Sequence, residues 1–208
     1  MCCVGRVLRY PSLRFGFSYE SKFWKNLHLK LCTFNFEFLT CMIILGIDPG
    51  LATLGFGVVE EKRNVVRAIH YGAILTEQGL TIGRRLEIIQ KELALLIKRY
   101  APDVACVETL FFFQNQKTII QIGQVHGILA ITFHKKKIPV VHYPPLQVKS
   151  VVTGDGRAKK KEVQERTRAI LGLPKERYPD DTYDALAIAL CHILKQNQPA
   201  KMRPRKKD

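Results

Sequence analysis

The chain has 208 residues, of which 47% are hydrophobic and 25% are charged, and its formal net charge is +15. This length and composition fit one globular domain with a sizeable core. They exclude a membrane-spanning helix, because no apolar run reaches the roughly 18 residues required, and we expect no membrane partner. The positive charge favours a polyanionic partner such as nucleic acid, although a basic protein without such a partner has the same composition.

The six cysteines do not form a pattern typical of disulfides or of a metal site. No two of them make a C-x-x-C pair, and Cys106 and Cys191 lie inside apolar runs, as small core residues do. We therefore expect a reducing compartment, namely the cytoplasm.

Residues 1–41 differ from the rest of the chain. They are rich in aromatic and basic residues, and they lack the apolar region and the cleavage site of a signal peptide. Met42 directly precedes the first convincing strand, so we interpret residues 1–41 as an extension outside the fold; a basic targeting segment is the alternative. Residues 42–196 form the expected domain, and residues 197–208 form a basic tail that we expect to be disordered.

From Met42 onward, short apolar runs and amphipathic stretches follow one another regularly. The expected strands are 42–47, 53–59, 65–75, 104–107 and 139–142, and the expected helices are 82–100, 117–134, 160–171 and 181–195. Residues 144–158, which contain Pro and Gly, are expected to form a connection. This order predicts an α/β fold with a mixed five-stranded sheet and helices on both faces. The first three strands should form an antiparallel meander, and strands one, four and five should be parallel.

Four carboxylates occupy positions typical of a metal-dependent site. Asp48 and Glu108 follow the first and fourth strands, and the carboxyl ends of adjacent parallel strands meet at one edge of a sheet. Asp181 and Asp184 are three residues apart, which places them on one face of the last helix. Carboxylates that converge repel one another unless a cation is present, and oxygen ligands favour Mg²⁺ or Mn²⁺.

Each carboxylate also has a structural interpretation. An Asp before Pro-Gly is commonly a turn former, and Asp181 and Asp184 could cap a helix and complement its dipole. Glu108 is harder to explain in this way, because a carboxylate that ends a buried strand needs a partner.

These motifs, taken together and in order, resemble the RuvC family of bacterial Holliday-junction resolvases. The resemblance runs from Met42 to about Lys195 and is carried by Ile44–Gly50 (ILGIDPG), Glu108–Phe111 (ETLF), Tyr143–Gly156 and Asp181–Ala189 (DTYDALAIA). It implies an RNase H-like fold and a homodimer that nicks two opposed strands of a four-way junction during DNA recombination and repair. It also implies a branch-migration complex of RuvA and RuvB as a partner.

The resemblance further implies a catalytic tetrad of Asp48, Glu108, Asp181 and Asp184 that binds two Mg²⁺ ions, with Mn²⁺ as an alternative. Asp48 would bridge both ions, Glu108 would complete one metal site, and Asp181 and Asp184 would hold the other. Water would attack the phosphodiester in line and leave 5′-phosphate and 3′-hydroxyl ends. Some family members carry a His at the third position, and Asp180 stands beside Asp181 here, so either aspartate remains a candidate.

Candidate DNA contacts lie near these carboxylates in the sequence. The resemblance places a base-stacking aromatic at Phe111, whose alternative role is in the core. Each basic residue alone is typical of a solvated surface, but together they favour phosphate contact; they are Lys149, Arg157, Lys159, Lys160 and Lys161. The helix 117–134, which contains Gly123 and Gly127, is a candidate dimer surface or an ordinary packing surface.

Two other function classes share parts of the pattern. An actin-like or sugar-kinase phosphotransferase also has Asp and Gly after its first strand, but it needs a second domain for which residues 42–196 leave no room. A DNA-binding module without catalysis would tolerate the loss of Asp48.

Overall fold

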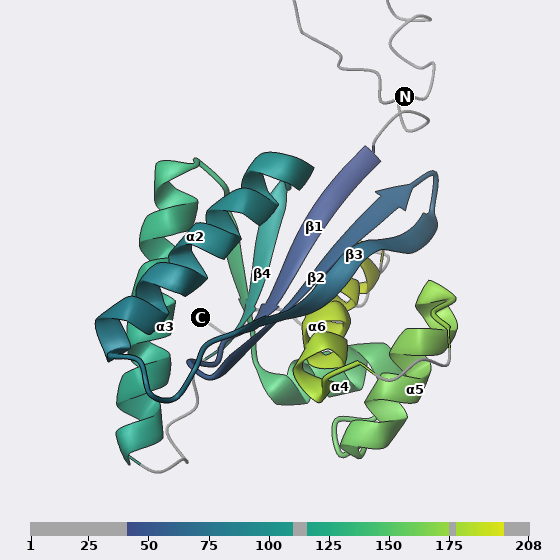
Figure 1. The fold of residues 1–208 in the computed structure, drawn as a ribbon. Helices are drawn as coiled ribbons and strands as arrows, with labels where there is room; N and C mark the ends of the chain where they lie inside the picture. Colours follow the sequence, from purple (N-terminus) through teal and green to yellow (C-terminus); the bar gives the residue numbers. More distant parts are fainter. Residues whose placement is uncertain (1–40, 110–115, 175–177, 198–208) are drawn as a thin grey trace, which may run out of the picture. The chain divides into compact units, whose positions relative to one another are not determined.

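The computed structural model describes residues 41–109, 116–174 and 178–197, all within one compact unit of the chain (Figure 1). The strands are β1 (Cys41–Asp48), β2 (Thr53–Lys62), β3 (Val65–Leu75), β4 (Val104–Glu108) and β5 (Val140–Tyr143). The helices are α2 (Ile82–Tyr100), α3 (Gln116–Lys135), α4 (Pro145–Thr153), α5 (Lys160–Leu171) and α6 (Asp180–Gln196). None of the described helices is long and apolar enough to cross a membrane. The expectations for residues 1–40 and 198–208 fall outside the described residues.

The strands form one mixed sheet in the order β3-β2-β1-β4-β5. Strand β2 is antiparallel to both β1 and β3, whereas β1 with β4, and β4 with β5, are parallel. The predicted five-stranded α/β sheet, its antiparallel meander and its three parallel strands are therefore confirmed. Strand β1 begins at Cys41, one residue earlier than expected, because Cys41 pairs with Lys62.

Helices cover both faces of the sheet (Figure 1). Alternate residues of a strand point to opposite faces, so Ile44 packs with the core around α4, α5 and α6, while Leu45 packs with the core around α2 and α3. Helix α2 contributes Ile89 and Leu93 to the second core, four residues apart on one face. The sheet edge at the carboxyl ends of β1 and β4 thus lies between two packed layers.

The expectation of an irregular connection at 144–158 was wrong for its first part. Residues Pro145–Thr153 form helix α4, which starts after Pro144 and ends at Gly154, whose φ is 89°. Proline is favoured in the first helical turn because its missing N–H would have no partner there, and glycine is favoured just after the last turn. The Pro and Gly residues that indicated a loop are in fact the start and stop signals of a short helix.

Helix α6 packs against the sheet through glycines of β1 and β2. A Cβ atom on Gly55 would overlap the main-chain oxygen of Asp181, and a Cβ atom on Gly46 would overlap that of Ala185. Glycine at these positions lets the helix backbone approach the strands more closely than any other residue would allow. The contact at Gly55 places the first turn of α6 directly over β2.

We expect Gly55→Ala to destabilise the protein by about 1–3 kcal/mol, because the added methyl group has no space between β2 and Asp181. Urea unfolding measures this change in the free energy of unfolding. Gly83→Ala is the matched control: Gly83 lies in α2 with open space around it, and the same substitution there should be neutral or stabilise by up to about 1 kcal/mol. Equal effects of the two substitutions would contradict the close-packing argument.

Candidate active site

Asp48 and Glu108 lie side by side at the carboxyl edge of the sheet. Strands β1 and β4 are parallel neighbours, and Ile47 is paired with Val107 in their register. The next residue on each strand is the carboxylate, so the backbone itself brings Asp48 and Glu108 together, as the sequence predicted. The core side chains of both strands fix this register.

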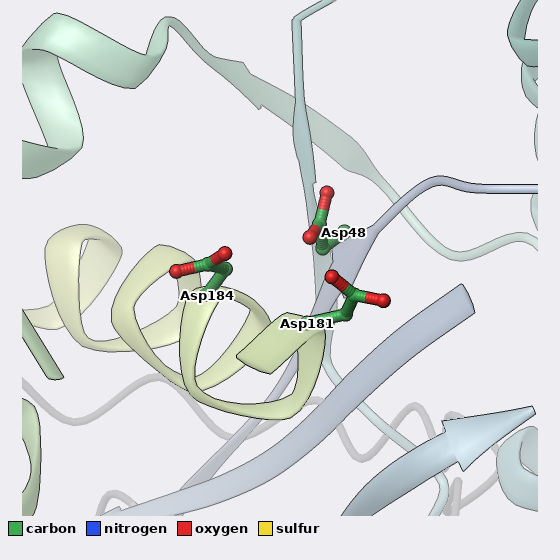
Figure 2. Close-up of side chains that lie close together, drawn as sticks. All are labelled: Asp48, Asp181 and Asp184. Atoms are coloured by element: carbon green, nitrogen blue, oxygen red, sulfur yellow. The ribbon is translucent and has the colours of Figure 1, made fainter. Parts of the chain in front are cut away.

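Helix α6 adds two more carboxylates to the same place. Asp48 pairs with Gly55 across β1 and β2, and Gly55 is the residue on which Asp181 rests. Carboxylate oxygens of Asp48, Asp181 and Asp184 all lie within 4.8 Å of one another. Figure 2 shows the side chains of Asp181 and Asp184 extending from the first turns of α6 toward Asp48. Glu108 is joined to this group by a side-chain hydrogen bond with Asp48 and by its electrostatic interaction with Asp184.

The two adjacent aspartates at the start of α6 point to different surroundings. Asp180 faces α5, where Gln164 Nε2 donates a hydrogen bond to its Oδ1 at 3.2 Å and Lys160 Nζ lies 3.5 Å from its Oδ2. Its side chain is 67% exposed. Asp181, by contrast, belongs to the acidic cluster. Of the two candidates that the sequence left open, Asp181 is the one placed to share a ligand with Asp48.

Burial and mutual repulsion make the charged form of this cluster unfavourable. Burial, together with the charges of Glu108, Asp184 and Asp181, raises the pKa of Asp48 to about 8. Burial and Asp184 raise the pKa of Glu108, and burial also raises the pKa of Asp184 despite its ion pair with Lys160. A cluster that offers only carboxylate oxygens and resists ionisation is suited to a hard divalent cation, which would stabilise the charged forms.

Lys160 and Lys149 border the acidic cluster on the side of α4 and α5. Lys160 Nζ lies 2.9 Å from Asp184 Oδ2. Although partial burial alone would lower it, this contact raises the pKa of Lys160 and keeps the ammonium charged. Both lysines line a cavity of about 170 Å³ together with Glu108 and Asp184. These two predicted DNA contacts therefore lie next to the carboxylates.

The other predicted DNA contacts are farther from the cluster or outside the described residues. Arg157, Lys159 and Lys161 are exposed around the start of α5, and they line neither the cavity that contains Glu108 and Asp184 nor the one that contains Asp48 and Asp181. Lys161 Nζ lies 4.0 Å from the Glu165 carboxylate on its own helix. Phe111 falls outside the described residues, so its predicted role stays a prediction.

The structure adds one basic residue that the sequence reasoning missed. Arg85 lines a second cavity, of about 610 Å³, together with Asp48 and Asp181. It lies four residues before Ile89 on the buried face of α2, so its position in the helical period was the available signal.

Comparison with known proteins identifies the family. The family model described as "Crossover junction endodeoxyribonuclease RuvC" matches residues 44–192. The chain belongs to the RuvC family. The RuvC of Caldanaerobacter subterraneus is 46% identical over 156 residues, which cover 75% of this chain and 94% of that protein. The RuvC of Clostridioides difficile is 45% identical over 151 residues, which cover 73% of this chain and 89% of that protein.

Solved structures agree with this assignment. The RuvC of T. thermophilus in complex with a Holliday junction substrate has a TM-score of 0.71 and 33% identity, and the match covers 74% of this chain and 94% of that one. The yeast mitochondrial Holliday junction resolvase Ydc2 has a TM-score of 0.54 at 15% identity, and so shows likeness of fold alone. The predicted RNase H-like fold and RuvC resemblance are confirmed.

Without a divalent cation, we expect this RuvC family member to lose stability as the pH rises from about 4 to about 8. The folded chain keeps a proton on Asp48 up to a pKa of about 8, whereas the unfolded chain releases it near 3.8. In that window the folded state binds more protons, so the free energy of unfolding falls with increasing pH. Asp48→Asn should reduce the fall by more than about 1 kcal/mol, as measured by urea unfolding in EDTA. If the free energy of unfolding depends on pH in the same way in both proteins, Asp48 ionises normally.

Proposed function

We propose that this chain is a structure-selective endonuclease that resolves four-way DNA junctions by hydrolysis of opposed phosphodiesters. The observation that carries this proposal is the convergence of Asp48, Asp181 and Asp184 within 4.8 Å at the carboxyl edge of the sheet, beside Glu108, in a chain of the RuvC family. The T. thermophilus relative was solved with a Holliday junction substrate, which supports the same substrate here. Neither a phosphotransferase nor a DNA-binding module without catalysis explains the family and the carboxylates together.

We propose that the four carboxylates hold two Mg²⁺ ions, with Mn²⁺ as an alternative. The donor set fits, because it contains only oxygen ligands and because its ionisation is opposed unless positive charge is added. Asp48 is central, since it interacts with each of the other three carboxylates, and would help to hold both ions. Glu108 would help to hold one ion, and Asp181 and Asp184 would help to hold the other. Bound ions would supply Lewis-acid stabilisation of the attacking and leaving oxygens.

The basic residues of α4 and α5 would hold the DNA strand over this site. Lys149 and Lys160 reach the cavity that contains Glu108 and Asp184, where a phosphate would bring them into charge-assisted hydrogen bonds. Lys160 also fixes the position of the Asp184 carboxylate through its ion pair. Arg157, Lys159 and Lys161 extend the positive surface outward and would contact phosphates farther along the strand. Phe111 is proposed to stack on an unpaired base near the cut.

A homodimer would present two such sites to the two-fold junction, and α3 offers a surface for it. The residues Ile120 and Ile131 are 64% and 50% exposed, although both are large and apolar. Gly127 lies between them on the same helical face, and a Cβ atom there would meet open space, as would one on Gly123. A helix face that exposes Ile120 and Ile131 next to small residues permits close approach of a second copy.

Further expectations concern the cellular compartment, the partner proteins and the bounds of the nuclease domain. We propose that it acts in the cytoplasm, which agrees with Cys106 and Cys191 being buried free thiols. We also propose that it cooperates with RuvA and RuvB, which the resemblance to the family suggests. We propose that the nuclease domain comprises residues 41–197, since Cys41 pairs with Lys62 in the sheet and Asn197 caps α6.

Cleavage of a synthetic four-way junction, compared with a linear duplex of the same sequence, tests the proposed function. We expect Mg²⁺-dependent nicking of opposed junction strands, no cleavage in EDTA, and little cleavage of the duplex. Asp48→Asn and Glu108→Gln should each reduce the cleavage rate by at least about 100-fold, since each removes a metal ligand, while junction binding survives.

Asp180→Asn is the control for these variants. It removes a carboxylate one residue from Asp181 that lies outside the acidic cluster, so cleavage should stay near the wild-type rate. Equal cutting of junction and duplex would reduce the proposal to a general nuclease. Undiminished cleavage by Asp48→Asn would remove the catalytic assignment.

We expect Ile131→Glu to convert a dimer into monomers, because it places a charge in the centre of the proposed α3 surface. Sedimentation equilibrium measures the change, and the paired nicking of one junction should become uncoupled. Leu95→Glu is the matched control, since Leu95 is a similarly exposed apolar residue, 59% exposed, on α2. If the wild-type protein is monomeric at all concentrations tested, α3 does not form a dimer interface.

A further inference from the structure

Arg85 is a buried cation whose position is fixed by hydrogen bonds. Its residue is 9% exposed, and its Nε donates a hydrogen bond to Thr76 Oγ1 at 2.8 Å. The Thr76 hydroxyl in turn donates to the main-chain oxygen of Leu51 at 2.5 Å, and the Thr76 N–H donates to Ala52 at 3.0 Å. These bonds tie the guanidinium of α2 to the loop that follows Asp48.

The remaining donors of Arg85 have no anionic partner in the described part of the chain. Its terminal nitrogens form none of the ion pairs there, and neither is a fully enclosed atom that lacks a partner. The side chain lines the cavity of about 610 Å³ that also contains Asp48 and Asp181. A guanidinium withdrawn from water without a counter-ion is costly, unless a ligand supplies the anion.

Arg85 is not the counter-ion of the acidic cluster. Lys160 is the cation that pairs with this end of α6, with its Nζ 2.9 Å from Asp184 and 3.5 Å from Asp180, whereas Arg85 forms none of the ion pairs in the described part of the chain. The acidic cluster therefore has its cationic neighbour on the α5 side. Arg85 has no anionic partner in the described part of the chain and can bind another group. The four N–H donors on its two terminal nitrogens, which have no anionic partner among the described residues, form a planar fork that matches the oxygens of a phosphate.

The basic residues lie on both sides of the carboxylates. Lys149 and Lys160 come from α4 and α5 on one face of the sheet and share a cavity with Glu108 and Asp184. Arg85 comes from α2 on the opposite face and shares its cavity with Asp48 and Asp181 (Figure 1). A nucleic-acid strand that crosses the sheet edge would meet a cation before and after the carboxylates.

We propose that Arg85 binds a phosphate of the cleaved DNA strand, on the opposite side of the scissile bond from Lys149 and Lys160. This inference rests on the proposed nuclease function. It makes Arg85 a substrate-binding residue that holds the strand in register over the metal ligands, and Thr76 the residue that orients it. The phosphate lies in the Asp48–Asp181 cavity, where negative charge would otherwise be repelled.

Arg85→Gln tests the proposal, with Arg84→Gln as its matched control. Arg84 is the adjacent arginine of α2, but its side chain is 54% exposed and it pairs with Glu87 at 2.6 Å. We expect Arg85→Gln to slow single-turnover junction cleavage about 10- to 100-fold, and Arg84→Gln to leave it unchanged. In EDTA, Arg85→Gln should reduce the slope of log affinity against log salt by about one. Arg85→Lys, which keeps the charge, should retain the slope and recover part of the rate.

A second measurement probes the contact from the DNA side and needs no variant to fold. Neutral methylphosphonates are placed one at a time at the phosphates that flank the cut. At one of these positions, the methylphosphonate should slow junction cleavage by the wild-type protein about as much as Arg85→Gln does. The same methylphosphonate should slow the Arg85→Gln protein little further, because that protein has already lost the contact. Urea unfolding confirms that the variant is folded.

The outcomes separate this inference from the proposed function. If the wild-type protein binds the junction with the expected Arg85-dependent slope but does not cut it, the nuclease proposal fails and the phosphate contact stands. If the wild-type protein cuts the junction and Arg85→Gln matches Arg84→Gln in both assays, the contact is refuted. A slower Arg85→Gln protein with an unchanged salt slope and unchanged methylphosphonate sensitivity would show a structural role and also refute it.

Discussion

The site depends on a contact between backbones, that of α6 with strands β1 and β2. Gly46 and Gly55 allow the helix to lie so close that a methyl group on either would overlap its main-chain oxygens. Because Asp181 and Asp184 occupy the first turns of α6, this contact sets their distance from Asp48. Three carboxylates at such separations, with Glu108 as a fourth charge acting on them, repel one another, and packing of the two cores holds them together. The protein thus uses fold stability to maintain a charge arrangement that favours a bound cation.

The distribution of basic residues follows from the layered architecture. The carboxylates lie on the sheet edge, so residues from the helices on each face can approach them from opposite sides. Lys160 belongs to the layer with α6 and pairs with Asp184, whereas Arg85 belongs to the other layer and is held by Thr76. A polyanionic strand laid across the edge would be bound on both sides and repelled only at the centre, where bound cations reverse the sign of the charge.

Much of this arrangement could be predicted from the sequence, because the relevant signals are local. The apolar stretch at Val65–Leu75 and the 3.6-residue pattern at Ile82–Tyr100 gave both elements with the bounds that the structure has. Asp48 and Glu108 could be paired because each follows a buried strand and crossover helices make those strands parallel. The helix at Pro145–Thr153 was missed because Pro and Gly mark both turns and helix ends, and only the backbone conformation distinguishes them.

By itself, the sequence determined the elements, the family, and which residues could act as metal ligands, since these depend on residue type and short-range spacing. The tertiary structure decided between Asp180 and Asp181, because neighbours on the helix differ by about 100° and only the packing of α6 shows which one faces Asp48. It also assigned Arg85 to the site. The cavity that Arg85 shares with Asp48 is formed by segments far apart in the chain, and their approach is set by long-range packing that no local pattern encodes.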